Sequence, residues 1–207
     1  MKNILILIFG TLLLIGCGQD NPSSNVENIE PLNAQTFQIE ESNIALSMPK
    51  EFMEITHENY NKLISMSDMS DEIKTYISQR VSSIGEQSNN NNLFIDSLTY
   101  NNVALIQRKG PHITLNKEVV NLLEQTYMSA PKTGVIVQEE EIVQKQLVTG
   151  KSYSYIKLKI QQKSVQGIRY LTNYLISTNK VTLSVSYLNA GDTDYQDYIN
   201  QTKFIKH

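Results

Sequence analysis

The sequence predicts an α+β fold: a largely antiparallel, twisted sheet with amphipathic helices packed on it, in a single domain. Three observations predict this class. Strand-like segments follow one another in pairs joined by short turns, two amphipathic helical segments interrupt those pairs, and a helical segment closes the chain. Strands joined by short turns pair antiparallel, and a helix between them buries its apolar stripe on the sheet that they form.

The first predicted strands are short. Alternating apolar residues begin at Phe37 and predict two strand runs that end at Pro49, and a short helical piece follows near residues 57–65. A hairpin is predicted for residues 93–109, because two apolar runs there flank the turn residues 100–102. The strands among these segments are expected to be the first strands of the sheet.

Three segments have the spacing of amphipathic helices. The first spans 70–85, with Ser70 as its N-cap and acids in its first turn, where they suit the helix dipole. The second lies within 111–131, and the third opens with a Thr193-x-x-Gln196 capping box. The residues expected to face the sheet are Ile73, Tyr76, Ile77, Val81 and Ile84 in the first helix, Val119, Leu122, Leu123 and Tyr127 in the second, and Tyr195, Tyr198, Ile199 and Thr202 in the third.

The region after Gly134 is β-rich. Runs over 135–148 and 153–162 flank a turn, and strands over 167–177 and 181–187 follow. Short turns between these runs predict consecutive antiparallel hairpins. This region therefore supplies most of the predicted sheet.

The strand predicted over 153–162 alternates between two sets of side chains. One set is Ser154, Ile156, Leu158 and Ile160, and the other is Tyr153, Tyr155, Lys157 and Lys159. A sheet with one face on the core and one in water gives this pattern. We therefore expect the second set to be exposed to solvent. These four residues are the candidate partner-binding residues.

The 11 tyrosines leave a second explanation open, because no tryptophan accompanies them. Several are expected to gather on the sheet, where aromatic cross-strand packing with hydrogen-bonded hydroxyls explains them without a partner. A tyrosine-lined face for a peptide, glycan or protein is the functional alternative. The tyrosines concerned are Tyr153, Tyr155, Tyr170, Tyr174 and Tyr187.

The first residues form an export signal. Lys2 gives a positive start, residues 4–15 are apolar apart from Gly10 and Thr11, and polar residues follow at once. The apolar run is shorter than the roughly 20 residues that a membrane-spanning helix needs. Residues 1–16 are therefore predicted to be a signal peptide.

The end of this leader, Leu14-Ile15-Gly16-Cys17, resembles the lipobox of bacterial lipoproteins, and Cys17 is the only cysteine of the chain. The resemblance implies diacylglycerol on Cys17, cleavage before it and further acylation of its amino group. Two or three acyl chains anchor a protein almost permanently. In enteric bacteria an aspartate after the cysteine retains lipoproteins in the inner membrane, so Gly18 at that position favours the outer membrane.

The predicted mature chain has two parts. Residues 17–36 are polar, with two prolines and few apolar residues, which predicts a lipidated cysteine followed by a flexible tether. Residues 37–207 form the globular domain. The 21 acidic side chains outnumber the 18 basic ones, and no basic patch stands out, which excludes nucleic acid as the predicted partner.

The order of elements over about 37–205 resembles the PsbP-like fold, which includes the DcrB-like lipoproteins. The residues that carry the likeness are the strand ending 44–49, the late strand 181–188 and the closing segment 198–204. The resemblance implies an accessory or assembly module attached to a larger apparatus. That family shares no catalytic residues that could be carried over.

The remaining candidates for chemistry do not converge. His57, His112 and His207 are scattered over a helix start, a loop and the terminus, whereas catalysis needs a converging set. The run 139–141 (Glu-Glu-Glu) offers oxygen ligands for a cation, but consecutive residues of a strand alternate faces. Protection of an edge strand is the better explanation. We therefore predict no catalytic, cofactor-binding or metal-binding residues.

The functional prediction is accordingly general. The chain is expected to be a lipid-anchored, non-catalytic accessory or binding module of the bacterial cell envelope. Its partners would be the membrane, through acyl chains on Cys17, and an envelope protein, a peptide or a glycan. The alternative is an envelope hydrolase whose active site does not match a known motif.

Overall fold

Strands make up most of the described chain. The computed structural model describes residues 32–39, 44–67, 71, 74–75, 91–129, 137–164 and 167–204. The strands are β1 (Ala34–Ile39), β2 (Ile44–Pro49), β3 (Phe52–Ile55), β4 (Asn91–Asp96), β5 (Val103–Pro111), β6 (Val137–Thr149), β7 (Tyr153–Ser164), β8 (Gly167–Thr178), β9 (Val181–Asn189) and β10 (Lys203–Phe204). The helices are α1 (His57–Met66), α3 (Lys117–Ser129) and α4 (Gln196–Asn200).

The predicted α+β class is wrong, because the part of the chain that the structure describes is mostly β and its three helices are short. These helices have 10, 13 and 5 residues, whereas strands β6, β7 and β8 have 13, 12 and 12. The long hairpins after residue 137 therefore dominate the domain. The helix predicted over 70–85 lies outside the described residues, apart from isolated positions.

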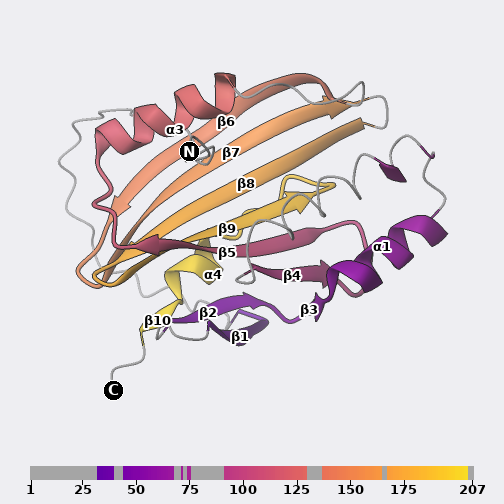
Figure 1. Cartoon of the computed structure of the whole chain (residues 1–207), viewed down its shortest axis with the longest axis horizontal. Coiled ribbons are helices and arrows are strands. Elements are labelled where there is room, and N and C mark those ends of the chain that lie inside the picture. Colours follow the sequence, from indigo (N-terminus) through magenta and orange to yellow (C-terminus); the bar gives the residue numbers. More distant parts are fainter. Residues whose placement is uncertain are drawn as a thin grey trace, which may run out of the picture.

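The strands form two sheets (Figure 1). The larger sheet has seven antiparallel strands in the order β3-β4-β5-β9-β8-β7-β6, and the smaller has the order β1-β2-β10. Consecutive strands β6 to β9 pair with their neighbours along most of their length, as short turns between them require. The predicted hairpins of this region are confirmed.

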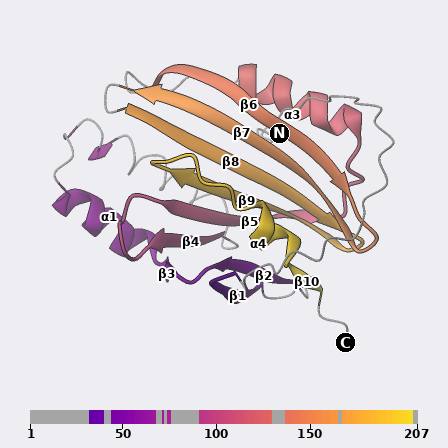
Figure 2. The same cartoon turned by 180° about the vertical axis from the view of Figure 1, so that it is seen from behind.

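The two faces of the larger sheet are covered by different elements. Neighbouring residues of a strand point to opposite faces. Tyr155 accordingly lies in a cluster with β2 and with Tyr195 and Ile199 near the C-terminus, whereas Ile156 lies in a cluster with α3. Helix α3 lies on the face that is nearer in Figure 1, and α4 lies on the face that is nearer in Figure 2.

A third cluster lies at the other end of the sheet. There Tyr60 and Ile64 of α1 pack on Leu93 and Ile95 of β4. Helix α1 begins after Thr56, whose side chain accepts a hydrogen bond from the backbone N–H of Asn59 over 3.2 Å. The sheet is therefore covered by helices at both ends of one face.

Two predicted boundaries differ from the structure. Strand β1 begins at Ala34, inside the range 17–36 that was assigned to the tether, and pairs with β2 along its whole length. The closing helix α4 ends at Asn200, and the residues after it form β10, which pairs with β2. Cys17 and the leader 1–16 lie outside the described residues. Among the residues that are described, no helix is long and apolar enough to cross a membrane.

Candidate functional site

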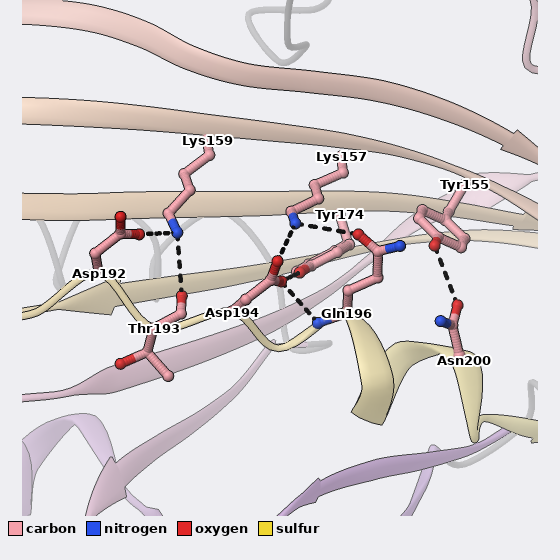
Figure 3. A network of polar contacts seen from close by, with 9 residues as sticks. All are labelled: Tyr155, Lys157, Lys159, Tyr174, Asp192, Thr193, Asp194, Gln196 and Asn200. Carbon is pink, nitrogen blue, oxygen red and sulfur yellow. Dashed lines mark hydrogen bonds and ion pairs between the residues drawn. The ribbon is translucent and has the colours of Figure 1, made fainter. Parts of the chain in front are cut away.

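The four predicted partner-binding residues share one face of β7, but that face is covered. Tyr155 is 1% exposed, Lys157 is 0% exposed and Lys159 is 6% exposed. In Figure 3 these three side chains project from the strand towards the C-terminal segment, residues 192–200, which lies over them. The predicted wet face is therefore wrong. The alternation along β7 separates two buried faces, because a second layer covers each of them.

Lys157 is the centre of the polar contacts on this face. Its Nζ donates to Asp194 Oδ2 over 2.6 Å and to Gln196 Oε1 over 3.1 Å. A fully buried ammonium group is costly unless it is paired and hydrogen-bonded. The C-terminal segment supplies both partners, so the burial of this lysine depends on that segment being in place.

Asp194 binds more than the lysine. Its Oδ1 accepts from the hydroxyl of Tyr174 over 3.2 Å and from the backbone N–H of Gln196 over 3.0 Å. Burial tends to raise the pKa of Asp194, but hydrogen bonds from Lys157 and the Gln196 backbone, together with the lysine charge, hold that pKa below its ordinary value of 3.8. The carboxylate therefore links β7, β8 and the start of α4.

Lys159 makes a second set of contacts two residues along the strand. Its Nζ forms an ion pair with Asp192, donates to the backbone carbonyl of Thr193 over 3.5 Å and lies 5.4 Å from the ring centre of Tyr170. A cation over an aromatic face is attracted by the ring quadrupole. Lys157 and Lys159 thus fasten successive residues of the same loop, 192–194 (Figure 3).

A row of tyrosine rings continues across the sheet beside the lysines. The successive ring pairs are Tyr153–Tyr155, Tyr155–Tyr174, Tyr174–Tyr187, Tyr187–Tyr195 and Tyr195–Tyr198. The closest pair is stacked, with ring centres 4.0 Å apart, and it joins β9 to the C-terminal segment. Aromatic cross-strand packing, the first of the two explanations above, therefore accounts for most of these tyrosines.

The tyrosine hydroxyls also bind the C-terminal segment. Tyr153 donates to the carbonyl of Ile199 and Tyr155 donates to Asn200 Oδ1, both over 3.1 Å. Burial raises the pKa of Tyr155 to about 12, and it raises the pKa of Tyr174 and Tyr187 above the usual range. These hydroxyls stay protonated at neutral pH. Tyr155 and Tyr174 donate to Asn200 and Asp194, whereas the Tyr187 hydroxyl is buried without a hydrogen-bond partner.

The cluster, defined as Lys157, Lys159, Asp192, Asp194, Gln196 and the tyrosine row, holds the C-terminal segment on the sheet. Apart from the buried Tyr187 hydroxyl, each polar atom named above has its partner inside the domain. An incoming ligand would have to displace the segment and leave a buried lysine unpaired. The arrangement stabilises the fold and is not a free binding surface.

A serine and a histidine come together at the other end of β8. Ser177 Oγ lies 3.2 Å from His112 Nδ1, and it donates to the backbone carbonyl of Ile113 over 2.5 Å. His112 Nδ1 also contacts the carbonyl oxygen of Thr178, which only accepts, so this nitrogen carries the hydrogen. It therefore does not serve as a base for Ser177, and the pair pins the segment after β5 onto the sheet.

His57 does not join this pair. His57 is the first residue of α1, and its Nε2 is buried without a hydrogen-bond partner. His207 lies outside the described residues. The structure therefore does not bring His57 and His112 into one site.

The three glutamates lie on the edge strand β6, and their edge position is confirmed. Glu139 pairs with Lys163 over 2.7 Å, and Glu140 accepts from Gln162 over 2.6 Å. Two register shifts interrupt the pairing of β6 with β7, and such bulges protect an edge as charges do. In the part of the chain that the structure describes, no three His, Cys, Asp or Glu side chains gather as metal ligands.

Sequence reasoning missed the partners of the two lysines. The capping box expected at Thr193 and Gln196 does not form, because α4 is capped at Tyr195 without a side-chain bond and the Gln196 side chain accepts from Lys157. A usable signal was present. Two lysines at alternate positions of an aromatic strand match two aspartates at alternate positions of the late loop, 192 and 194.

Comparison with protein-family models gives no match, and comparison with curated proteins gives none either. The resemblance to bacterial lipoproteins therefore stays a prediction from Cys17 and the leader. The resemblance to the PsbP-like fold likewise stays a prediction, made from the order of elements over about 37–205.

Proposed function

We propose that this chain is a lipid-anchored accessory or binding module of the bacterial cell envelope, tethered through Cys17. The observation that carries the proposal is the position of the single cysteine, directly after a charged start, a short apolar run and a small residue. Acyl chains on this residue would hold the domain at the membrane. Gly18 favours the outer membrane.

The described cluster does not offer a catalytic site. Its lysines and tyrosines bind the domain's own C-terminal segment, and the Ser177–His112 contact directs its hydrogens to backbone carbonyls. A catalytic group must instead reach a substrate and keep its proton-transfer partner. An envelope protein, peptide or glycan bound outside this cluster is the proposed partner.

The experiment is to follow lipid attachment in a bacterial host that makes the full chain. We expect metabolic incorporation of labelled palmitate, a mature protein that begins at Cys17 and partition into the detergent phase. Cys17→Ser should abolish all three, because the hydroxyl does not form the thioether. Ser23→Ala in the same polar segment is the matched control and should leave them unchanged.

The decisive measurement is mass spectrometry of the mature amino terminus. A mature chain that begins at another residue, without lipid, would contradict the proposal. Labelled palmitate in the Cys17→Ser variant would contradict it as well.

A further inference from the structure

The turn between β4 and β5, residues 97–102, presents two large apolar side chains to solvent. Leu98 is 74% exposed and Tyr100 is 50% exposed. Tyr100 has a φ of 57°, in the left-handed region, although Asn101 beside it is a residue type that accepts such a conformation more easily. The backbone therefore holds an aromatic residue in an unfavourable conformation at an exposed position.

Asp96 fixes the shape of this turn. Its carboxylate accepts from the backbone N–H of Leu98 over 2.9 Å, from Thr99 Oγ1 over 2.7 Å and from Asn102 Nδ2 over 2.9 Å. The backbone carbonyl of Asp96 also accepts from the N–H of Tyr100 over 2.9 Å. The exposed side chains thus stand on a rigid base, and a partner would not have to order them.

The turn lies beside the place where the chain enters the domain. The N–H of Lys50 donates to the Asn33 carbonyl over 3.2 Å, and Asn33 Nδ2 donates to Glu51 Oε1 over 2.9 Å. The N–H of Ser97 then donates to the Glu51 carbonyl over 2.8 Å. The first described residues and the turn are therefore joined through a single residue, Glu51.

Asn33 is 16 positions after Cys17. At about 3.4 Å per residue a chain of this length spans at most about 55 Å. Asn33 therefore lies within about 55 Å of the anchored residue, nearer to it along the chain than any later part of the domain. The two exposed apolar side chains lie on the same side of the domain as Asn33.

We propose that Leu98 and Tyr100 contact the interface of the bilayer to which Cys17 anchors the chain. This inference rests on the proposed lipid anchor. Tyrosine prefers the headgroup region, because its ring is apolar and its hydroxyl stays hydrated, and leucine gains from leaving water. The charged residues beside the turn, Lys50 and Glu51, have opposite signs, so their charges cancel. The contact therefore does not require anionic lipid.

The chain contains no tryptophan, so a single introduced tryptophan reports its own surroundings. The acylated full chain carrying Tyr100→Trp is reconstituted on phosphatidylcholine vesicles with and without spin-labelled lipid. The matched control is Leu122→Trp on α3, which is 53% exposed and lies over the far strands of the sheet. We expect a blue shift and quenching for Tyr100→Trp, and neither for Leu122→Trp.

Leu98→Trp is the second variant and replaces Tyr100→Trp if that variant fails to melt cooperatively. Unquenched emission from both turn variants on vesicles that retain the acylated protein would overturn the membrane contact while the lipid anchor stands. Crosslinking of the turn to an envelope protein instead of lipid would overturn it too. Absence of lipid on Cys17 would overturn the proposed function, and the contact with it.

Discussion

Asp194→Asn should destabilise the domain more than Lys157→Met, although the two residues form one ion pair. The Asp194 carboxylate is 49% exposed and the Lys157 side chain is 0% exposed. Neutralising the aspartate leaves a buried ammonium group without its counter-charge. Removing the lysine leaves a carboxylate that water and the Tyr174 hydroxyl still reach.

The magnitudes follow from this asymmetry. Breaking a fully buried pair by removing one partner costs about 3–5 kcal/mol. Water at the half-exposed carboxylate and the remaining bond from Lys157 to Gln196 reduce this, so we expect about 2 kcal/mol for Asp194→Asn. For Lys157→Met we expect about 1 kcal/mol or less, since the methionine fills the same apolar space. The larger loss corresponds to about 4–8 °C in melting temperature for a chain of this length.

Urea unfolding of the two single variants and the double variant measures these free energies, with Asp197→Asn on the exposed side of α4 as control. The control should change stability by less than about 0.5 kcal/mol. The double variant should be more stable than Asp194→Asn alone. A larger loss for Lys157→Met than for Asp194→Asn would refute the argument from burial.

The same pair makes a pH prediction. The pKa of Asp194 lies below its ordinary 3.8, so the folded state favours the carboxylate form. Its contribution is therefore complete above the ordinary pKa and is lost as the pH falls through the lowered one. The stability gap between wild type and Asp194→Asn should be constant near pH 6 and should shrink below about pH 4. A gap that stays constant down to pH 2 would contradict the stated pKa direction.

Two further predictions rest on burial, and a third tests the non-catalytic role. Ile199→Asp places a charge on the buried side of α4, at a position that is 0% exposed, and should cost about 3 kcal/mol or more, measured by thermal unfolding. Burial lowers the pKa of Lys109 from 10.5 to about 8, so Lys109→Met should raise the free energy of unfolding at pH 7, and this gain should vanish above pH 10.5. Replacing His57, His112 and His207 together by glutamine should leave partner capture from crosslinked cells unchanged. Loss of capture with an intact fold would favour the hydrolase.

The strands were predictable where local pattern and turn residues agreed. Alternation over 153–162 gives β7, and the turn at 178–180 separates β8 from β9. The fold class was not predictable from the same data. A five-residue α4 and a longer helix share the same apolar spacing over 195–199, and only the pairing of β10 with β2 ends the helix early.

The predicted binding face failed for a physical reason that local pattern does not contain. A strand with two buried faces and a strand with one wet face both alternate if the polar side chains of the second face are paired. Lys157 and Lys159 supplied the polar character that indicated water, and their carboxylate partners lie more than 30 positions later in the chain. Tyr155→Ala would therefore remove a buried ring and the hydrogen bond to Asn200, and it would destabilise the domain rather than weaken partner binding alone.

The face of β7 around Lys157 and the turn 97–102 differ in which contacts their side chains would lose on binding a partner. Around Lys157 every polar contact is already made within the domain, so a partner gains nothing until the C-terminal segment is removed. At the turn, Leu98 and Tyr100 are exposed while Asp96 already satisfies the backbone that carries them. Binding there buries apolar surface without breaking a contact or ordering a loop. Interaction is therefore expected at the rigid, exposed turn and not on the strand whose composition first suggested it.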